Sequence, residues 1–167
     1  MNARMNTRTV MLWVLIASII LTLAFIFSNS LRTPEQSLEQ SGAVGSFMAT
    51  IFPPDTALGG FIHENIRKIA HFVEYALLGA EAALLISFYL GRRLSVVLAA
   101  IPCAAVVALV DETLQYFSDR GPAILDVWID LGGFATGLSA LLGAVLAAQA
   151  VIKARKSHSN KTENKDG

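Results

Sequence analysis

The sequence carries little charge for its length, and its charges cancel. Of 167 residues, 16% are charged, and 13 Lys and Arg balance 13 Asp and Glu. A soluble domain carries about a quarter charged residues, so this composition argues against a water-soluble protein. A net charge of zero gives no support for a nucleic-acid partner. The one cysteine, Cys103, cannot form an internal disulfide and is expected to be a small buried hydrophobe.

Sequence motifs of familiar soluble enzymes are also missing. The sequence contains no glycine-rich phosphate loop and no G-x-S-x-G nucleophile motif. His63 and Glu64 begin an H-E-x-x-H pattern, but Arg67 occupies the position of the second histidine. A zincin-type metalloprotease helix is therefore excluded.

Four long apolar runs are present, at about 10–27, 72–90, 94–117 and 124–152. Each is long enough to cross about 30 Å of hydrocarbon, where only helices satisfy their own backbone hydrogen bonds. They predict an all-α integral membrane bundle of four transmembrane helices, forming one domain over residues 1–152. The first run is longer than a signal-peptide core of about 7–15 residues, which favours a retained anchor.

The basic residues predict the orientation, because Lys and Arg concentrate on the cytoplasmic side of membrane proteins. Most of them lie before the first run, between the second and third, or after the fourth, so both termini are expected to be cytoplasmic. Residues 153–167 are expected to form a polar cytoplasmic tail, which lacks fixed structure over 156–167. The long outer loop contains an apolar stretch at 42–52 that predicts a short interfacial helix. Residues 61–75 are expected to run straight into the second span.

Polar side chains gather at the same ends of three of these runs. On the second run, Lys68, His71, Glu74 and Tyr75 recur at helical spacing and form one stripe along the helix. Glu81 continues this stripe and is a candidate proton-binding or interhelical acid. Because successive spans are antiparallel, all three sets are expected at one depth near the outer face. On the fourth run, Gly133 and Gly137 would let another helix approach closely. The gathered residues are Lys68, His71, Glu74, Tyr75, Asp111, Glu112, Gln115, Arg120, Asp126 and Asp130.

These residues can be interpreted in two ways. They form a chemical site, or they make polar contacts that hold the helices together. In the first interpretation, the acids and the histidine perform general acid–base catalysis, and the others bind substrate. A divalent cation such as Mg²⁺ or Ca²⁺ on the oxygen ligands is a weaker alternative. The catalytic candidates are His71, Glu74, Asp111, Glu112, Asp126 and Asp130. The substrate-binding candidates are Lys68, Tyr75, Gln115 and Arg120.

The same residues carry a resemblance to a known family. The blocks "RKIAHFVEYALLGA" and "DETLQYFSDRGPAILDVWIDLGGFATG" resemble the VanZ-like family of bacterial membrane proteins, and "FSNSLRTPEQS" is similar to the start of that family's first outer loop. The likeness covers about residues 10–150. It implies an integral protein of the bacterial plasma membrane, from a family whose founding member is associated with resistance to the glycopeptide teicoplanin.

The resulting expectation is an envelope protein with an outer-leaflet polar site. It would confer teicoplanin resistance or handle a lipid-linked cell-wall precursor, by catalysis or by binding. Its expected partners are membrane lipids and the precursor or the glycopeptide. A small proton- or ion-coupled transporter and a non-enzymatic membrane scaffold remain as alternatives.

Overall fold

The computed structural model describes residues 6–119, 121 and 123–163. Over these ranges the chain folds into helices without a strand, which confirms the all-α prediction. The elements are α1 (Thr7–Ser30), α2 (Pro34–Ile51), α3 (Ala57–Leu85), the π-helical turn η1 (Ile86–Leu90), α4 (Leu94–Phe117) and α5 (Ile124–Glu163).

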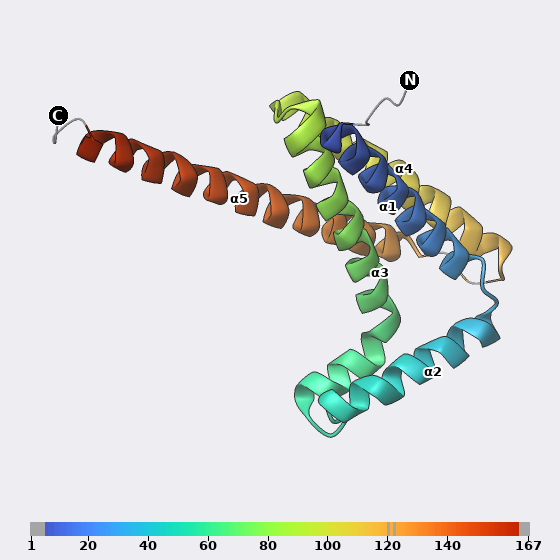
Figure 1. Cartoon of the computed structure of the whole chain (residues 1–167). Coiled ribbons are helices and arrows are strands. Elements are labelled where there is room, and N and C mark those ends of the chain that lie inside the picture. Colours follow the sequence, from blue (N-terminus) through green and yellow to red (C-terminus); the bar gives the residue numbers. More distant parts are fainter. Residues whose placement is uncertain (1–5, 120, 122, 164–167) are drawn as a thin grey trace.

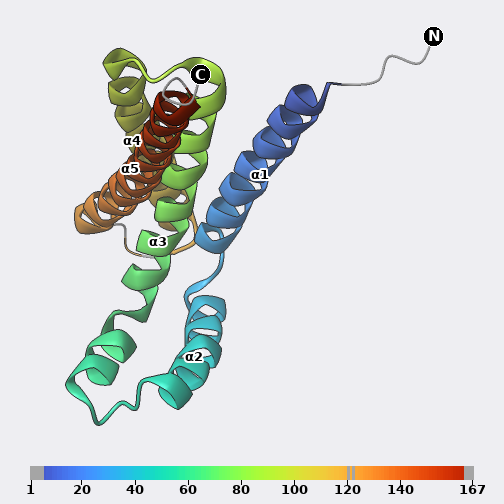
Figure 2. The ribbon, with the colours of Figure 1, turned by 60° about the vertical axis from the view of Figure 1, so that its left-hand side comes forward.

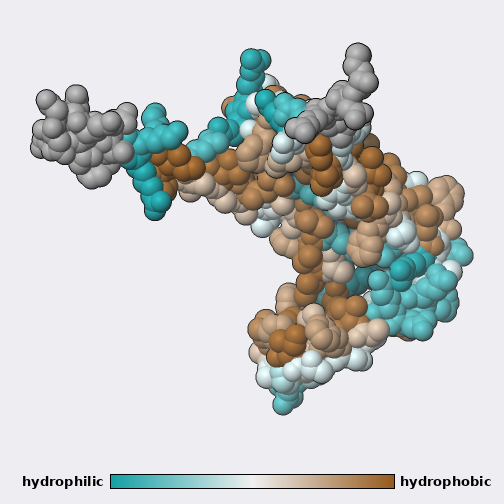
Figure 3. Space-filling model, in the orientation of Figure 1, coloured by the Kyte–Doolittle hydropathy of each residue, from teal (hydrophilic) through white to brown (hydrophobic). Residues whose placement is uncertain are grey.

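Four of these helices are long and apolar enough to cross a membrane, as predicted. Large apolar side chains cover the surface, and Leu21, Phe117 and Trp128 are each at least two-thirds exposed. Figure 3 shows this mainly apolar surface over the helical body. Such a surface suits lipid rather than water. The expectation of a buried Cys103 is wrong, because its face of α4 is exposed in the same way. The protein is a multi-pass membrane protein.

Helix α3 lies at the centre of the molecule and packs against α1, α2 and α5. Helix α4 packs against α1 and α5 (Figures 1 and 2). In Figure 1, α5 crosses α3 near its own N-terminal end, and its C-terminal half extends away from the other helices. The 40 residues of α5 give a length of about 60 Å, roughly twice the hydrocarbon thickness of a bilayer. The shared core therefore lies at the N-terminal part of α5.

Glycines allow α3 and α5 to approach one another closely. A Cβ atom at Gly137 would lie 1.8 Å from the carbonyl oxygen of Ala76, and one at Gly133 would lie 2.3 Å from that of Phe72. On α3, a Cβ at Gly79 would lie 2.1 Å from the carbonyl oxygen of Phe134. The expected close approach at Gly133 and Gly137 is confirmed, and α3 is the partner helix.

The outer-loop helix is longer than the predicted stretch at 42–52. It starts at Pro34, where the Thr33 hydroxyl accepts from the backbone N–H of Gln36 and the Gln36 side chain accepts from that of Thr33. This reciprocal pair satisfies two N–H groups that the helix end would otherwise leave free. Helix α2 lies across the end of α3 in both ribbon views (Figures 1 and 2).

Residues 61–75 run into the second span as expected, since both lie in α3, but the helix bends on the way. Helix α3 bends at Asn65, whose backbone leaves helical geometry at φ −116° and ψ 16°. The Asn65 side-chain amide donates to the carbonyl of Phe61 at 3.0 Å. That carbonyl is the one the Asn65 backbone N–H would use in a regular helix, so the side chain competes with the backbone.

The polar tail is also more ordered than expected. Helix α5 continues through Glu163, so the expectation of a tail without fixed structure is wrong for residues 156–163. No glycine or proline follows Gly143 before Glu163, and nothing in the sequence therefore breaks the helix. Residues 164–167 lie outside the described part of the chain.

Glu81 joins α1 to α3 within the membrane-spanning region. Its side chain is buried and accepts hydrogen bonds from the hydroxyls of Ser18 at 2.5 Å and Thr22 at 3.1 Å. Both bonds end on the same carboxyl oxygen, Oε1. Of the two functions predicted for this acid, interhelical pairing has direct structural support.

We expect Glu81→Gln to retain this link, because an amide oxygen can accept the same two hydroxyl protons. Glu81→Ala removes both bonds and is expected to cost about 1.2 kcal/mol, at about 0.6 kcal/mol for each interhelical bond. Thermal unfolding of the purified protein in detergent, followed by circular dichroism, measures the difference. Equal loss in both variants would show that the carboxyl proton or charge matters more than the hydrogen bonds.

Candidate functional site

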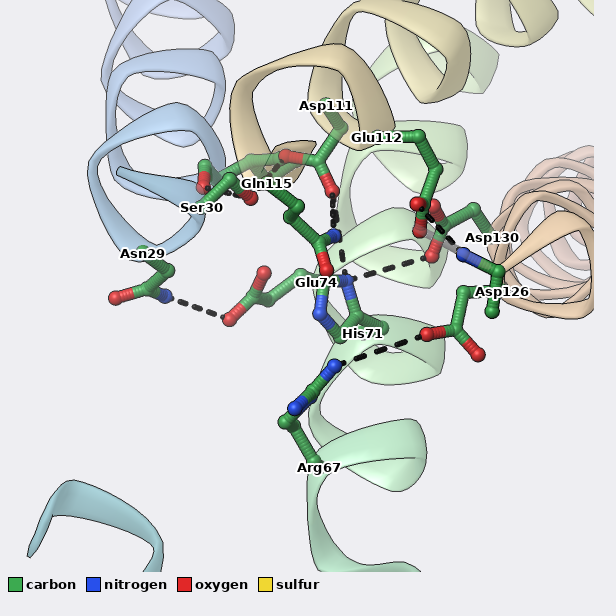
Figure 4. A network of polar contacts seen from close by, with 12 residues as sticks. Asn29, Ser30, Arg67, His71, Glu74, Asp111, Glu112, Gln115, Asp126 and Asp130 are labelled. Carbon is green, nitrogen blue, oxygen red and sulfur yellow. Dashed lines mark hydrogen bonds and ion pairs between the residues drawn. The ribbon is translucent and has the colours of Figure 1, made fainter. Parts of the chain in front are cut away.

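The predicted polar residues meet where four helix segments come together. The C-terminal ends of α1 and α4, the start of α5 and the part of α3 beyond its bend surround one cluster (Figure 4). The antiparallel spans thus place residues distant in the sequence side by side, as the sequence argument expected. Most side chains of the cluster are buried: His71, Asp111, Glu112, Gln115, Asp126 and Asp130.

The centre of the cluster is His71 between two carboxyl groups. Its Nδ1 atom lies 3.6 Å from Oδ2 of Asp111 and 3.6 Å from Oδ1 of Asp130. Both aspartate side chains are fully buried, one on α4 and the other on α5. The histidine on α3 therefore stands at the junction of three helices.

Asp111 is held in place by neighbours on two helices. The hydroxyl of Ser30, the last residue of α1, donates a short hydrogen bond to Asp111 Oδ1. The side-chain amide of Gln115, one turn along α4, donates to Asp111 Oδ2 at 3.2 Å. Gln115 is fully buried, so it orients Asp111 from within the protein instead of lining the cavity described below.

Glu74 has a partner that the sequence reasoning missed. The side-chain amide of Asn29 donates to Glu74 Oε1 at 2.8 Å. Asn29 and Ser30 directly follow the first apolar run, so the depth argument used for the other spans could have included them. Helix α1 thus contributes two polar residues to the cluster.

The basic residue that reaches the acids is Arg67 and not Lys68. Arg67 Nη2 lies 3.9 Å from Asp126 Oδ2, but its side chain is 45% exposed, so this ion pair adds little stability. Lys68 is exposed, and no ion pair joins it to another described residue. Glu112 accepts from the backbone N–H of Ala123 at 3.0 Å, which fixes the chain just before α5.

Of the two remaining substrate-binding candidates, Tyr75 and Arg120, the structure describes only Tyr75. Tyr75 is fully buried in the apolar core, and its hydroxyl has no hydrogen-bond partner among the described residues. It does not line the cavity next to the cluster. Arg120 lies outside the described residues.

A cavity of about 70 Å³ opens beside the cluster, between the end of α1, helix α2 and helix α3. Its wall includes His71 and Glu74, so a ligand there would touch two of the catalytic candidates. The cavity is mostly polar on the α2 side, where Ser37, Gln40 and Ser41 face it. The full wall is Asn29, Ser37, Gln40, Ser41, Val44, Ile66, Arg67, Ala70, His71 and Glu74.

The arrangement can support two kinds of chemistry. A histidine and a carboxylate on one cavity wall can exchange protons with a bound group. One nitrogen and two carboxylate oxygens, from His71, Asp111 and Asp130, also lie within 4.8 Å of one another, a set that could hold a metal ion. The sequence argument placed a cation on oxygen ligands alone, whereas this set includes a nitrogen. Of the other predicted oxygen ligands, Glu112 accepts from the backbone N–H of Ala123 and Asp126 pairs with Arg67.

Comparison with protein families gives a match that covers most of the chain. The VanZ/LLP1 family model matches residues 13–147, which include every residue of the cluster. Comparisons with curated proteins and with solved structures give no match. The matched region contains all four membrane-length helices in whole or in large part. The chain therefore belongs to the VanZ/LLP1 family.

Proposed function

We propose that this protein acts in the bacterial cell envelope, where its polar site binds the head group of a lipid-linked cell-wall precursor at the outer leaflet. Binding there would limit the access of teicoplanin to the precursor. The observation that carries the proposal is the cavity between α2 and α3, which reaches His71 and Glu74. It gives the buried cluster a route to the membrane surface.

The size of the cavity bears on which molecule enters it. A site that encloses a drug-sized ligand measures about 300–1,000 Å³, several times this cavity of about 70 Å³. A whole glycopeptide does not fit, whereas one sugar or peptide group of a larger molecule does. The proposal therefore assigns the cavity to part of the precursor and not to the antibiotic.

The charge of the cluster indicates which groups it would bind. Five carboxyl groups face one histidine and one arginine among the described residues of the cluster. An excess of carboxylates repels bare phosphate and favours hydrogen-bond donors. The hydroxyl and amine groups of sugars and peptides are such donors. The acids are Glu74, Asp111, Glu112, Asp126 and Asp130.

Helix α2 supports a location at the membrane surface. It turns Ser37, Gln40 and Ser41 toward the cavity, while Leu38 and Phe47 are exposed. Figure 3 shows hydrophilic residues gathered over the first turns of this helix. A helix with a polar and an apolar side suits the boundary between head groups and hydrocarbon. It would cover the site and leave an entrance for a lipid head group.

The experiment that tests the proposal compares cells with and without the protein. Expression should raise the teicoplanin concentration that inhibits growth, and it should change the amount or composition of precursor lipids in the outer leaflet. Inhibitory concentration and mass spectrometry of extracted lipids measure the two effects. Unchanged values in both would contradict the proposal.

The same proposal requires the cluster to face outward, and the excess of Lys and Arg on the opposite side supports this. A reporter inserted near Gln40 should be external, and one fused after Lys156 should be cytoplasmic. The opposite pattern would put the cavity on the inner face and remove the argument from wall precursors.

The buried carboxyl group of Glu81 favours a second candidate function, proton- or ion-coupled transport. It lies within the membrane-spanning part of α3, and its Oε2 atom has no hydrogen-bond partner among the described residues. A flux into proteoliposomes that collapses in Glu81→Gln would favour transport over precursor binding. Four spans without a repeat make a transporter dependent on oligomerisation.

A further inference from the structure

The carboxyl group of Asp130 is buried without the contacts such a group needs. Its side chain is fully buried, and neither oxygen has a hydrogen-bond donor among the described residues. A buried carboxylate is strongly disfavoured unless donors or a cation compensate for the lost water. The basic nitrogen paired with it, His71 Nδ1, lies 3.6 Å away, beyond the length of a hydrogen bond.

The geometry around this carboxyl group is close to that of a metal site. One atom each of His71, Asp111 and Asp130 lies within 4.8 Å of the other two, and the two separations from His71 Nδ1 are 3.6 Å. Ligand atoms that share an ion at about 2.1 Å lie roughly 3.0–3.4 Å apart. The two separations from His71 Nδ1 exceed a hydrogen bond and require only a small contraction to reach that range, and the two carboxyl groups lie within 4.8 Å of one another. Figure 4 shows both carboxyl groups directed toward the imidazole.

Neighbouring residues also fix the positions of the three side chains, as is usual for metal ligands. Ser30 and Gln115 donate hydrogen bonds to Asp111, which fixes the orientation of its carboxyl group. Asp130 lies one turn before Gly133, where α5 touches the backbone of α3. His71 is the neighbour of Phe72, whose carbonyl makes that contact. The backbones of α3 and α5 are therefore fixed close to both ligands.

We propose that His71, Asp111 and Asp130 form a binding site for a first-row divalent cation, Zn²⁺ or Mn²⁺. A set of one imidazole and two carboxylates suits these ions, whereas Mg²⁺ and Ca²⁺ favour oxygen ligands alone. Of the three ligands, His71 borders the cavity, so an ion would enter from that side, past the imidazole ring. This proposal concerns the free protein and does not depend on the proposed function.

Metal retention by the purified full-length protein tests the proposal. The protein in detergent is stripped with a chelator, incubated separately with Zn²⁺, Mn²⁺, Mg²⁺ or Ca²⁺, desalted and analysed for metal content. We expect one Zn²⁺ or Mn²⁺ ion per chain and no retained Mg²⁺ or Ca²⁺. The electron paramagnetic resonance spectrum of bound Mn²⁺ should differ from that of the free ion.

Asp130→Asn should weaken binding of the same ion by about 10-fold or more, because it replaces a carboxylate ligand with an amide. Glu81→Gln is the matched control, since it neutralises another buried acid of the same protein outside the three ligands and should bind like the wild type. Circular dichroism and size-exclusion profiles show whether each variant is folded.

Three results would overturn the proposal. They are a wild-type protein that retains neither Zn²⁺ nor Mn²⁺, retention of Mg²⁺ or Ca²⁺ in their place, and a folded Asp130→Asn variant that binds like the wild type. The wild-type measurement stands even if the variant does not fold. None of these results requires teicoplanin or wall precursors, so failure here is distinguishable from failure of the proposed function.

Discussion

Replacing Gly137 with valine is expected to prevent α5 from packing on α3. A Cβ atom at this position would lie 1.8 Å from the carbonyl oxygen of Ala76 and 2.7 Å from its carbonyl carbon. Both are backbone atoms, so no side-chain rotation relieves the overlap and the two helices must move apart. Overpacking costs typically 1–3 kcal/mol, and a backbone overlap of this size should cost about 3 kcal/mol or more. Loss of this contact would also displace Asp130, which lies two turns earlier on α5.

Gly143→Val is the matched control for this prediction. It makes the same exchange on the same helix, but apart from its chain neighbours and the backbone of its own helix, no atom lies within 4 Å of the added Cβ. We expect wild-type melting temperature and membrane level for Gly143→Val, and a large drop in both for Gly137→Val. Thermal unfolding in detergent and quantitative blotting of membranes measure the two quantities. A Gly137→Val protein as stable as the control would show that α3 and α5 do not make this contact.

The helical architecture could be predicted because one physical requirement dominates it. Apolar runs of this length must form helices in hydrocarbon, and the structure has a membrane-length helix at each of the four runs. The bend at Asn65 could not be predicted in the same way. It depends on the side-chain amide of Asn65, which competes with the backbone for the carbonyl of Phe61. The pattern of apolar residues does not indicate this competition.

The meeting of polar residues from three spans could also be predicted, because antiparallel helices of similar length bring alternate ends to one level. The individual contacts between these residues could not be predicted. Spacing along α3 placed Lys68 on the same stripe as His71, yet Arg67 is the residue that reaches Asp126. Side-chain length and the bend of α3 decide that contact, and neither follows from helical periodicity. Asn29 also contacts the cluster, and the depth argument could have included it, but spacing along α1 does not indicate that its partner is Glu74.

The proposed function predicts that three substitutions in the cluster abolish teicoplanin protection without lowering the amount of protein in the membrane. His71→Ala removes the side chain between the two aspartates, Asp111→Asn replaces the carboxyl group beside it with an amide, and Glu74→Gln changes the acid on the cavity wall. Each keeps the helix-forming backbone, and the two amide replacements keep nearly the same volume. We expect the inhibitory concentration of teicoplanin to fall to that of cells lacking the protein.

Exposed residues on the same helices provide matched controls for these substitutions. Glu64→Gln repeats the Glu74 exchange at an exposed position of α3, and Thr113→Val alters an exposed polar residue two positions after Asp111. Both controls should keep full protection, because neither residue belongs to the cluster or the cavity wall. Full protection by all three cluster variants, at wild-type membrane levels, would disprove a functional site here. The polar contacts would then serve only to hold the helices together, at about 0.6 kcal/mol for each interhelical bond.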